Sequence, residues 1–370
     1  MQLAEFLPGA TPSPATRLTE TAGRRMGVLP TVDPSVLGDW DKQVDRHPAA
    51  TFFHGAAWVR VLQKAYAFKP AFFTTVERDG VPVVLPLIET ESWLAGRRGI
   101  GLPFADEAAP LCSEPDAAQP LIKAAMEWGR QRKWKSIELR GGRELFPDAP
   151  ASMSFYGHTV NLAGDEQQMF SRLDDSVRRA IRKAEKAGLA VTISRDLDAM
   201  KIFYRLQCLT RRKHGLPPQP FAFFRAILEE ILAKDQGMIV LVRSANRAVA
   251  ASVYFYRGQR ATYKYGASDE ACQQLRGSNL VMWEAIKWLA SRGFRTLHLG
   301  RTSLANEGLR RFKLNWGADE SKMDYVKYDF RRNAWITETD RVTGWHNRVF
   351  RALPLGASRL IGGVLYRHLA

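Results

Sequence analysis

The chain contains one phrase twice, 160 residues apart: AMEWGRQRKWKSIEL at residues 125–139 and AIKWLASRGFRTLHL at residues 285–299. In each copy, apolar residues at helical spacing lead into a short alternating strand. The aligned pairs include Trp128 with Trp288, Arg132 with Arg292, Trp134 with Phe294, and Ser136 with Thr296. A repeated helix–strand unit indicates one fold used twice, which lets the two copies take on different roles.

A second correspondence lies upstream of each copy. Residues 71–90 and residues 238–256 both read as two apolar strands around a turn, at Asp79-Gly80 and at residues 244–247. The offset of about 167 residues is close to that of the first repeat. Strands that alternate with helices predict the mixed α/β (α+β) class, with each unit a mixed sheet flanked by helices.

The length and composition fit two domains. A chain of 370 residues with 45% apolar composition has room for two cores. We expect a flexible tail at residues 1–32, a first domain at 33–157, a second domain carrying the site at 158–335, and a basic amphipathic helical segment at 336–370. Three cysteines without CxxC spacing predict neither a disulfide framework nor a metal site.

The charge points to anionic partners. Lys and Arg outnumber Asp and Glu by 54 to 38, a net charge of +16. Such a surplus favours nucleic acid, phosphorylated substrates or an anionic membrane face. Because no signal peptide or membrane span is evident in the sequence, we expect a cytoplasmic protein.

Basic residues concentrate in residues 171–215, with 12 Lys and Arg against 5 Asp and Glu. The apolar spacing predicts one helix over residues 167–188. Its polar face carries Arg178, Arg182 and Lys186, which we interpret as contacts for tRNA or another polyanion, although a solvated helix face explains them equally well. Arg212 and His214 close this basic segment and are candidate phosphate contacts.

A glycine turn precedes the helix of the second copy. It consists of Gln274, Arg276, Gly277, Ser278 and Asn279, with Leu275 between the first two. Glycine allows close approach of the backbone, and the first amides of a helix bind anions. The alternative is a helix cap at Ser278 with no ligand. The first copy has an acidic, proline-containing segment at residues 112–116 instead, so we place the site in the second copy.

With these elements in order, the chain resembles the Fem-type family of aminoacyl and peptidyl transferases, and also proteins with a BioF2-like acetyltransferase domain that occur near exopolysaccharide genes. The segments that carry the resemblance are residues 53–58, 102–106, 179–184, 212–215, 300–301 and 308–313. The resemblance implies two tandem GNAT-like domains and the transfer of an aminoacyl or acyl group onto an amine of a peptidoglycan precursor or another cell-envelope or polysaccharide-related acceptor. GNAT enzymes use a Gln/Arg-x-x-Gly-x-Gly/Ala turn for coenzyme A, from which this chain departs at Asn279.

The resemblance also assigns residues. In the Fem-type family a Phe-Lys-x-x-aromatic-Gly segment supplies a catalytic lysine, which corresponds here to Lys313 in residues 312–317. Its cation would stabilise an oxyanion or hold a phosphate of the acceptor or donor. Asp106, followed by Glu107, is our candidate base, and Tyr265 and Arg301 are further candidates for substrate binding. The sequence has no Gly-x-Ser-x-Gly elbow, which agrees with direct transfer without an enzyme nucleophile.

Several alternatives stay open at this level. The donor is either aminoacyl-tRNA or acyl-CoA, as a co-substrate and not as a tightly bound cofactor, and the acceptor is expected to carry phosphate. The chain could instead be a non-catalytic nucleic-acid-binding protein. The basic, apolar segment at residues 345–369 fits peripheral contact with the inner membrane face or packing on the first domain. The acyl group, the base and the oligomeric state are not predicted.

Overall fold

The computed structural model describes residues 31–77, 80–338 and 350–368, so nearly all of the tail expected at residues 1–32 lies outside it. The elements of the first half are α2 (Trp40–Val44), α3 (Ala56–Tyr66), β1 (Lys69–Pro70), β2 (Phe73–Val76), β3 (Pro82–Leu85), β4 (Ile88–Ser92), β5 (Gly96–Ile100), α4 (Pro115–Gln131) and β6 (Ser136–Arg140). The others are β7 (Met153–Asn161), α5 (Glu166–Ser171), α6 (Asp175–Lys186), β8 (Ala190–Ser194), α7 (Leu197–Lys213), α8 (Phe221–Glu230), β9 (Gly237–Ser244), β10 (Arg247–Arg257), β11 (Arg260–Ser268), α9 (Gly277–Ser291), β12 (Thr296–Ser303), α10 (Glu307–Leu314), β13 (Ala318–Asp329), β14 (Ala334–Trp335) and α12 (Leu355–Leu365).

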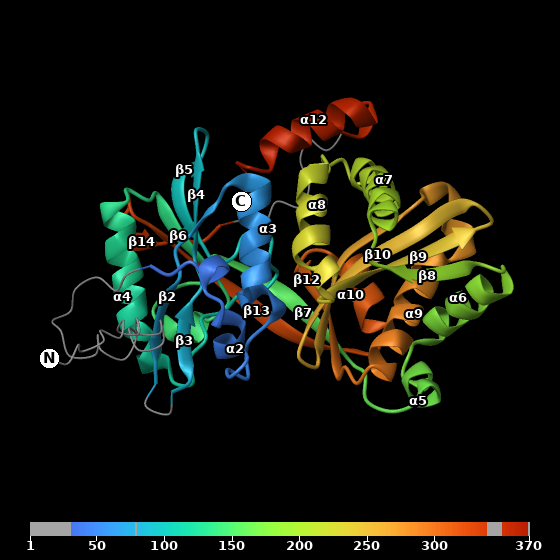
Figure 1. Cartoon of the computed structure of the whole chain (residues 1–370), viewed down its shortest axis with the longest axis horizontal. Coiled ribbons are helices and arrows are strands. Elements are labelled where there is room, and N and C mark those ends of the chain that lie inside the picture. The colour runs from blue at the N-terminus through green and yellow to red at the C-terminus, as the bar shows by residue number, and fades with distance from the viewer. Residues whose placement is uncertain (1–30, 78–79, 339–349, 369–370) are drawn as a thin grey trace, which may run out of the picture.

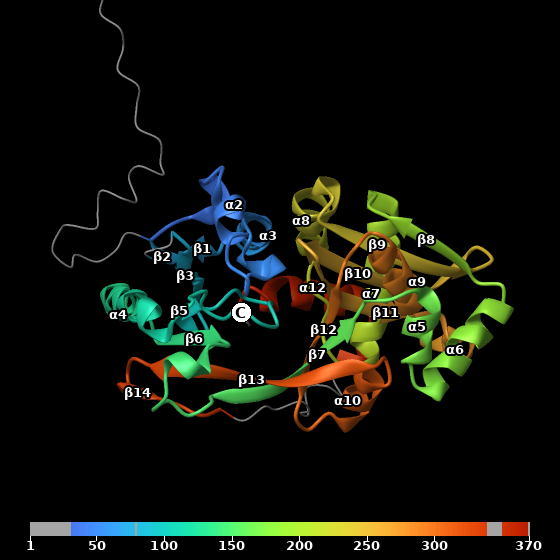
Figure 2. The same cartoon turned by 90° about the horizontal axis from the view of Figure 1, so that it is seen from below.

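Both halves contribute to one sheet. Its strand order is β1-β4-β5-β6-β13-β7-β12-β11-β10-β9-β8, with β14 paired to β13, while β2 and β3 form a separate hairpin. The long strand β13 pairs with β6 on one side and β7 on the other, and Figure 2 shows it running beneath both halves. The domain boundary expected at residue 158 therefore falls inside β7, at the seam of a continuous sheet.

The repeat has a structural counterpart in the strand pairing. In the first half β5 and β6 run parallel and pair at Arg98 with Ser136 through Ile100 with Glu138. In the second half β11 and β12 run parallel and pair at Arg260 with Thr296 through Thr262 with His298. Each helix of the repeated phrase, α4 or α9, leads into the inner strand of its pair. The prediction of one mixed α/β fold used twice is confirmed.

The two copies differ at the aromatic residue before the inner strand. In the first copy the indole nitrogen of Trp134 donates to Glu89 on β4 at 2.7 Å, and Arg132 donates to both oxygens of the same carboxylate. In the second copy Phe294 packs on Tyr256 with ring centroids 5.0 Å apart. A buried tryptophan needs an acceptor for its N–H, whereas phenylalanine does not.

The expected helix over residues 167–188 is two helices. α5 ends at Ser171 and α6 begins at Asp175, because the Asp174 side chain accepts a hydrogen bond from the Ser176 amide and caps the second helix. The apolar stripe continues across the break, since Met169, Leu173, Val177 and Ile181 are all buried. Hydrophobic spacing alone could not reveal the interruption.

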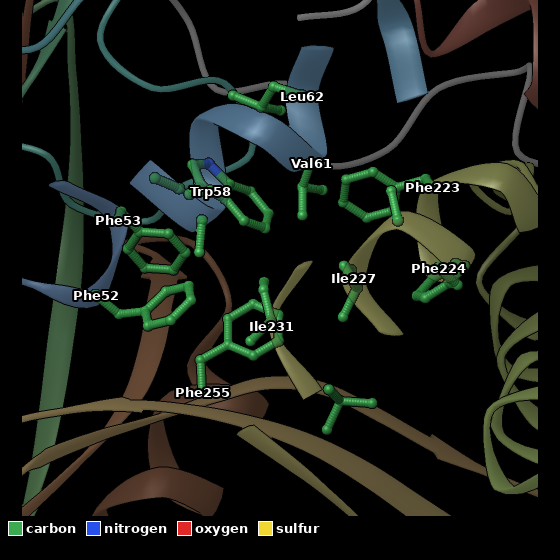
Figure 3. Close-up of a cluster of buried hydrophobic side chains, with 14 of the residues drawn as sticks. Phe52, Phe53, Trp58, Val61, Leu62, Phe223, Phe224, Ile227, Ile231 and Phe255 are labelled. Carbon is green, nitrogen blue, oxygen red and sulfur yellow. The ribbon is translucent and has the colours of Figure 1, made fainter. Parts of the chain in front are cut away.

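An aromatic core joins the two halves above the sheet. Figure 3 shows α3 of the first half facing α8 and β10 of the second. Trp58 on α3 lies with its ring 5.9 Å from both Phe223 on α8 and Phe255 on β10. All three side chains are fully buried. This packing joins the two halves, with α3 and α8 side by side at the middle of the molecule (Figure 1).

We predict that Glu89→Ala lowers the free energy of unfolding by about 3 kcal/mol, because Arg132 and the Trp134 N–H lose a buried acceptor. Urea unfolding measures the change. The matched control is Glu91→Ala on the same strand: Glu91 is 59% exposed and pairs with Arg97, so the expected loss is below about 0.5 kcal/mol. Equal losses in the two variants would contradict this assignment.

Candidate functional site

The central parallel strands of the second half separate beyond their three paired residues. The pairing of β11 with β12 ends at Thr262 with His298, and the pairing of β12 with β7 is irregular between His298 and Arg301. Gly300 sits in this irregularity with φ +72°, a conformation that favours glycine. A Cβ atom there would lie 3.2 Å from the Asp106 carboxylate. A loop of the first half thus enters the gap between the two strands.

Asp106 is surrounded by cations in this gap. Lys264 of β11, whose side chain is 6% exposed, approaches the carboxylate at 3.3 Å and donates to the Phe104 carbonyl at 2.5 Å. Burial raises the pKa of Asp106, but Lys264 and Arg301 outweigh it and hold that pKa below its usual value. The carboxylate is therefore ionised at neutral pH.

Lys313 on α10 reaches β12 at Gly300, the residue beside the Asp106 carboxylate. Its ammonium donates to the Gly300 carbonyl at 2.7 Å and to the Arg301 carbonyl at 3.0 Å, and the residue is 5% exposed. Burial lowers the pKa of Lys313 to about 8, against the opposing influence of Asp106. An ammonium has three N–H donors, so one is left beyond these two carbonyls.

A smaller pocket of about 300 Å³ opens at the start of β11 and β12, and its walls include Phe53, Glu107, Arg260 and His298. Burial lowers the pKa of His298 to about 4, so the ring is neutral at pH 7. Because the Gly300 amide donates to its Nδ1 atom at 3.2 Å, the neutral ring carries its proton on Nε2. Burial raises the pKa of the Glu107 carboxyl, which makes it a better proton acceptor.

A larger pocket of about 590 Å³ lies between α6, the end of β11, the first turn of α9 and α10. Its polar walls include Arg179, Lys183, Lys213 and Arg276. Lys213 pairs with Glu270 at 2.9 Å, whereas the other three cations form no salt bridge within the described residues. At the start of α9 the Asn279 and Leu280 amides donate to the Arg276 carbonyl, while the Gly277 and Ser278 amides have no backbone acceptor within the described residues. This combination suits an anionic ligand.

The structure places the predicted residues in three groups. Asp106, Arg301 and Lys313 meet at β12. Lys313 donates to the Arg301 carbonyl, and the Tyr325 hydroxyl of β13, which receives a hydrogen bond from the Arg301 side chain, donates to the Asp106 carbonyl. The turn residues Arg276, Gly277, Ser278 and Asn279 line the larger pocket, but Gln274 is not among its walls. Arg212 and His214 lie at the end of α7, and neither lines the larger pocket, although their neighbour Lys213 does.

The remaining predicted residues face elsewhere. Tyr265 packs against Phe203, Phe223 and Phe224 in the aromatic core, where burial raises the pKa of its hydroxyl well above the usual value. Lys186 does not line the larger pocket, and neither do Arg178, which pairs with Asp175, and Arg182, which stacks over Phe170.

The cations of α6 that do line the pocket, Arg179 and Lys183, were not among the predicted site residues. Arg179 lies three residues after Ser176, which also lines the pocket, and Lys183 lies seven residues after it. This helical spacing places the three side chains on one face of α6, and it is the signal that could have identified the two cations.

The comparisons with known proteins agree with this geometry. Residues 171–322 match the family model described as an acetyltransferase (GNAT) domain. The protein is therefore an acyltransferase of GNAT fold. No curated protein matches the sequence.

Solved structures show the same arrangement over most of the chain. FemX superposes with a TM-score of 0.63 at 14% identity, covering 77% of this chain and 94% of that one. A tandem GNAT protein from the clavulanic acid pathway gives 0.51 at 11% identity, with 81% and 97% covered. The L-PGS structure from Bacillus licheniformis gives 0.51 at 11% identity, with 92% and 99% covered. These likenesses establish the fold.

We predict that Asp106→Asn destabilises the protein by about 3 kcal/mol at pH 7, because the buried Lys264 ammonium loses its anionic partner. Since the folded-state pKa of Asp106 is depressed, its contribution is present above the unfolded pKa near 3.8 and is lost as the pH falls through the folded value. Urea unfolding at several pH values should show the difference from wild type shrinking in acid.

The control is Asp319→Asn, the same chemical change at an exposed position of β13, with an expected effect within about 0.5 kcal/mol. A loss for Asp106→Asn no larger than this, or one that grows in acid, would rule out the buried ion pair as the cause.

Proposed function

We propose that this protein is an N-acyltransferase whose donor binds through its phosphates in the larger pocket and whose amine acceptor enters the smaller one. The observation that carries the proposal is the set of Arg179, Lys183 and Arg276, three cations without salt-bridge partners in the described structure, around the start of α9. Helix amides together with arginine and lysine side chains are a suitable environment for a pyrophosphate.

An acyl-CoA is the donor that the pocket favours. A volume of about 590 Å³ lies within the range of sites for ligands of this size. Phe312 of α10 and Ser268 at the end of β11 are also part of the wall, and Lys313 is the next residue of α10. A thioester arm that extends from bound phosphates would enter the sheet at the gap between β11 and β12.

Lys313 would act on the carbonyl of the donor. When the amine attacks, the carbonyl oxygen takes up negative charge, and a buried cation with a remaining N–H stabilises it. The two backbone carbonyls that accept from Lys313 hold the ammonium in place, so little reorganisation is needed during the reaction.

Glu107 is better suited than Asp106 to accept the proton of the amine. Burial raises the Glu107 pKa, whereas the Lys264 and Arg301 cations hold the Asp106 pKa low. In this scheme Asp106 positions Lys264 and offsets the positive charge of the site. The amine loses a proton to Glu107, its nitrogen forms the amide bond, and the thiolate leaves and takes up a proton.

Aminoacyl-tRNA is the second candidate donor. The fold similarity to FemX covers both halves, and the basic residues of α6 outside the larger pocket extend the positive surface. The carbonyl chemistry would be the same, with a ribose hydroxyl as leaving group. The acceptor would then be an amine of a cell-envelope or polysaccharide-related molecule that carries phosphate.

We predict that acetyl-CoA binds to the wild-type protein and that Lys183→Ala weakens this binding by about tenfold, because a phosphate loses a charged partner. Isothermal titration calorimetry measures the affinity. The matched control is Lys186→Ala, on the same helix but outside the pocket, with affinity unchanged within about twofold. Binding of charged tRNA but not of acetyl-CoA would favour the second donor. Equal effects of the two lysine variants would contradict a phosphate site in this pocket.

We predict that the rate of acyl transfer falls as the pH rises through about 8, where the buried Lys313 ammonium loses its proton. The measurement is kcat/KM against pH, with consumption of the donor as the readout. Lys313→Arg should remove this fall, even if its overall rate is lower, since arginine does not titrate in this range. A fall at the same pH in both proteins would exclude Lys313 as the titrating group.

A further inference from the structure

The C-terminal helix α12 buries small residues and exposes large aliphatic ones, which is unusual for a helix on the surface of a water-soluble protein. Its buried positions are the small residues Ser358 and Gly362, and a Cβ atom at Gly362 would collide with the Pro218 carbonyl. Its outward positions are Leu360 at 77%, Ile361 at 38% and Val364 at 65% exposure. An amphipathic helix that packs on a protein core has the opposite arrangement.

The inner face of α12 is held by polar contacts. The Tyr366 hydroxyl accepts a hydrogen bond from Arg211 at 2.5 Å and donates to the Pro217 carbonyl at 3.2 Å. Arg359 stacks over the ring of Tyr204 on α7. These contacts seat the helix with its aliphatic side chains directed outward, so the exposure does not result from a poorly anchored terminus.

A second apolar segment adjoins the helix. The tip of the β4–β5 hairpin carries Trp93 at 82% and Leu94 at 59% exposure. His368, just beyond α12, accepts from the Trp93 indole at 3.1 Å and forms a hydrogen bond with Ser92 at 2.9 Å. In Figure 1 the hairpin and the helix lie at the same edge of the molecule. Of the eleven large apolar side chains exposed in the described structure, these two segments supply five.

The α12 side of this surface is positively charged. Residues 341–370 contain five arginines and no aspartate or glutamate. Arg351, Arg359 and Arg367 are all exposed beside the aliphatic side chains. Exposed leucine, isoleucine, valine and tryptophan with arginines beside them match the composition of elements that lie in a bilayer interface.

We propose that α12 and the β4–β5 hairpin tip form a docking surface for the anionic face of a lipid bilayer, with Trp93, Leu94, Leu360, Ile361 and Val364 in the headgroup region. No helix of the described chain is long and apolar enough to cross a membrane, so contact would be in the interface. Neither the donor nor the transfer chemistry enters this inference.

Docking would bring the membrane near the proposed site. The Tyr366 ring lies 6.0 Å from Phe104, whose carbonyl accepts from Lys264 beside Asp106. If the proposed function holds, an acceptor anchored in the bilayer would meet the protein on the side where the Asp106 loop lies. The proposed docking does not depend on that function.

The test is flotation of the full-length protein with vesicles. Vesicles of phosphatidylglycerol and phosphatidylcholine should carry the protein, and vesicles of phosphatidylcholine alone should carry much less. Leu360→Glu should weaken binding to the anionic vesicles by about tenfold or more, because a carboxylate replaces an inserted aliphatic side chain. Its circular dichroism and unfolding should match wild type, since the side chain is exposed.

The matched control is Val36→Glu, which makes the same charge change at a position that is also 77% exposed but lies outside α12 and the hairpin. It should bind vesicles like the wild type. Equal loss in the two variants would show general attraction by a basic protein, and unchanged binding of Leu360→Glu would also overturn the proposal. The proposal would also be overturned if light scattering detected a wild-type dimer that Leu360→Glu dissociates, and if the wild type did not bind vesicles.

Discussion

The ion pair between Asp106 and Lys264 is the contact on which the arrangement of the site depends. It joins a loop of the first half to β11 of the second, in a gap where β11 and β12 are no longer paired. The same loop supplies the Phe104 carbonyl, which accepts a hydrogen bond from the buried Lys264 ammonium. Burial lowers the pKa values of Lys313 and His298, and the Asp106 charge opposes both shifts.

The repeat explains why such a loop is available. Arg140 of the first copy corresponds to Gly300 of the second at the same offset of 160 residues. Arg140 donates to the Leu102 carbonyl at 3.2 Å and to the Ala105 carbonyl at 3.0 Å, which fixes the loop that ends in Asp106. Gly300 has no side chain and leaves the space that the Asp106 carboxylate occupies. The first copy therefore holds the loop through Arg140, and the second copy leaves room for its Asp106 carboxylate at Gly300.

The sequence predicted the fold well because its signals are local. The repeated phrase fixed a helix and a strand in each half, and the apolar runs fixed the hairpin of β9 and β10. The continuation of one sheet through both halves was not predictable, because the pairing of β13 with both β6 and β7 joins residues far apart in the chain. The break between α5 and α6 was missed because Asp174 acts through a cap and leaves the apolar spacing unchanged.

The candidate site was predictable in part. Lys313 and Asp106 were found through motifs, yet their convergence across 200 residues of sequence could come only from the fold. Tyr265 shows how a strand misleads: the pairing of β11 with β10 is irregular at Lys264, so the alternation of faces is interrupted there. Tyr265 enters the aromatic core, and the ammonium of its neighbour Lys264 lies over the Phe53 ring of that core and reaches Asp106. Arg179 and Lys183 were missed because a helix with basic residues all along its polar face does not reveal which of them faces a cavity.

We place the donor's phosphates between α6 and the first turn of α9, with its carbonyl beside Lys313. The most direct measurement is a crystal structure of the protein with bound acetyl-CoA. The account predicts phosphate oxygens within hydrogen-bond distance of Arg179, Lys183 or Arg276, and the thioester carbonyl within that distance of the Lys313 ammonium. Density for the phosphates at another surface, or a thioester that points away from the gap between β11 and β12, would contradict it.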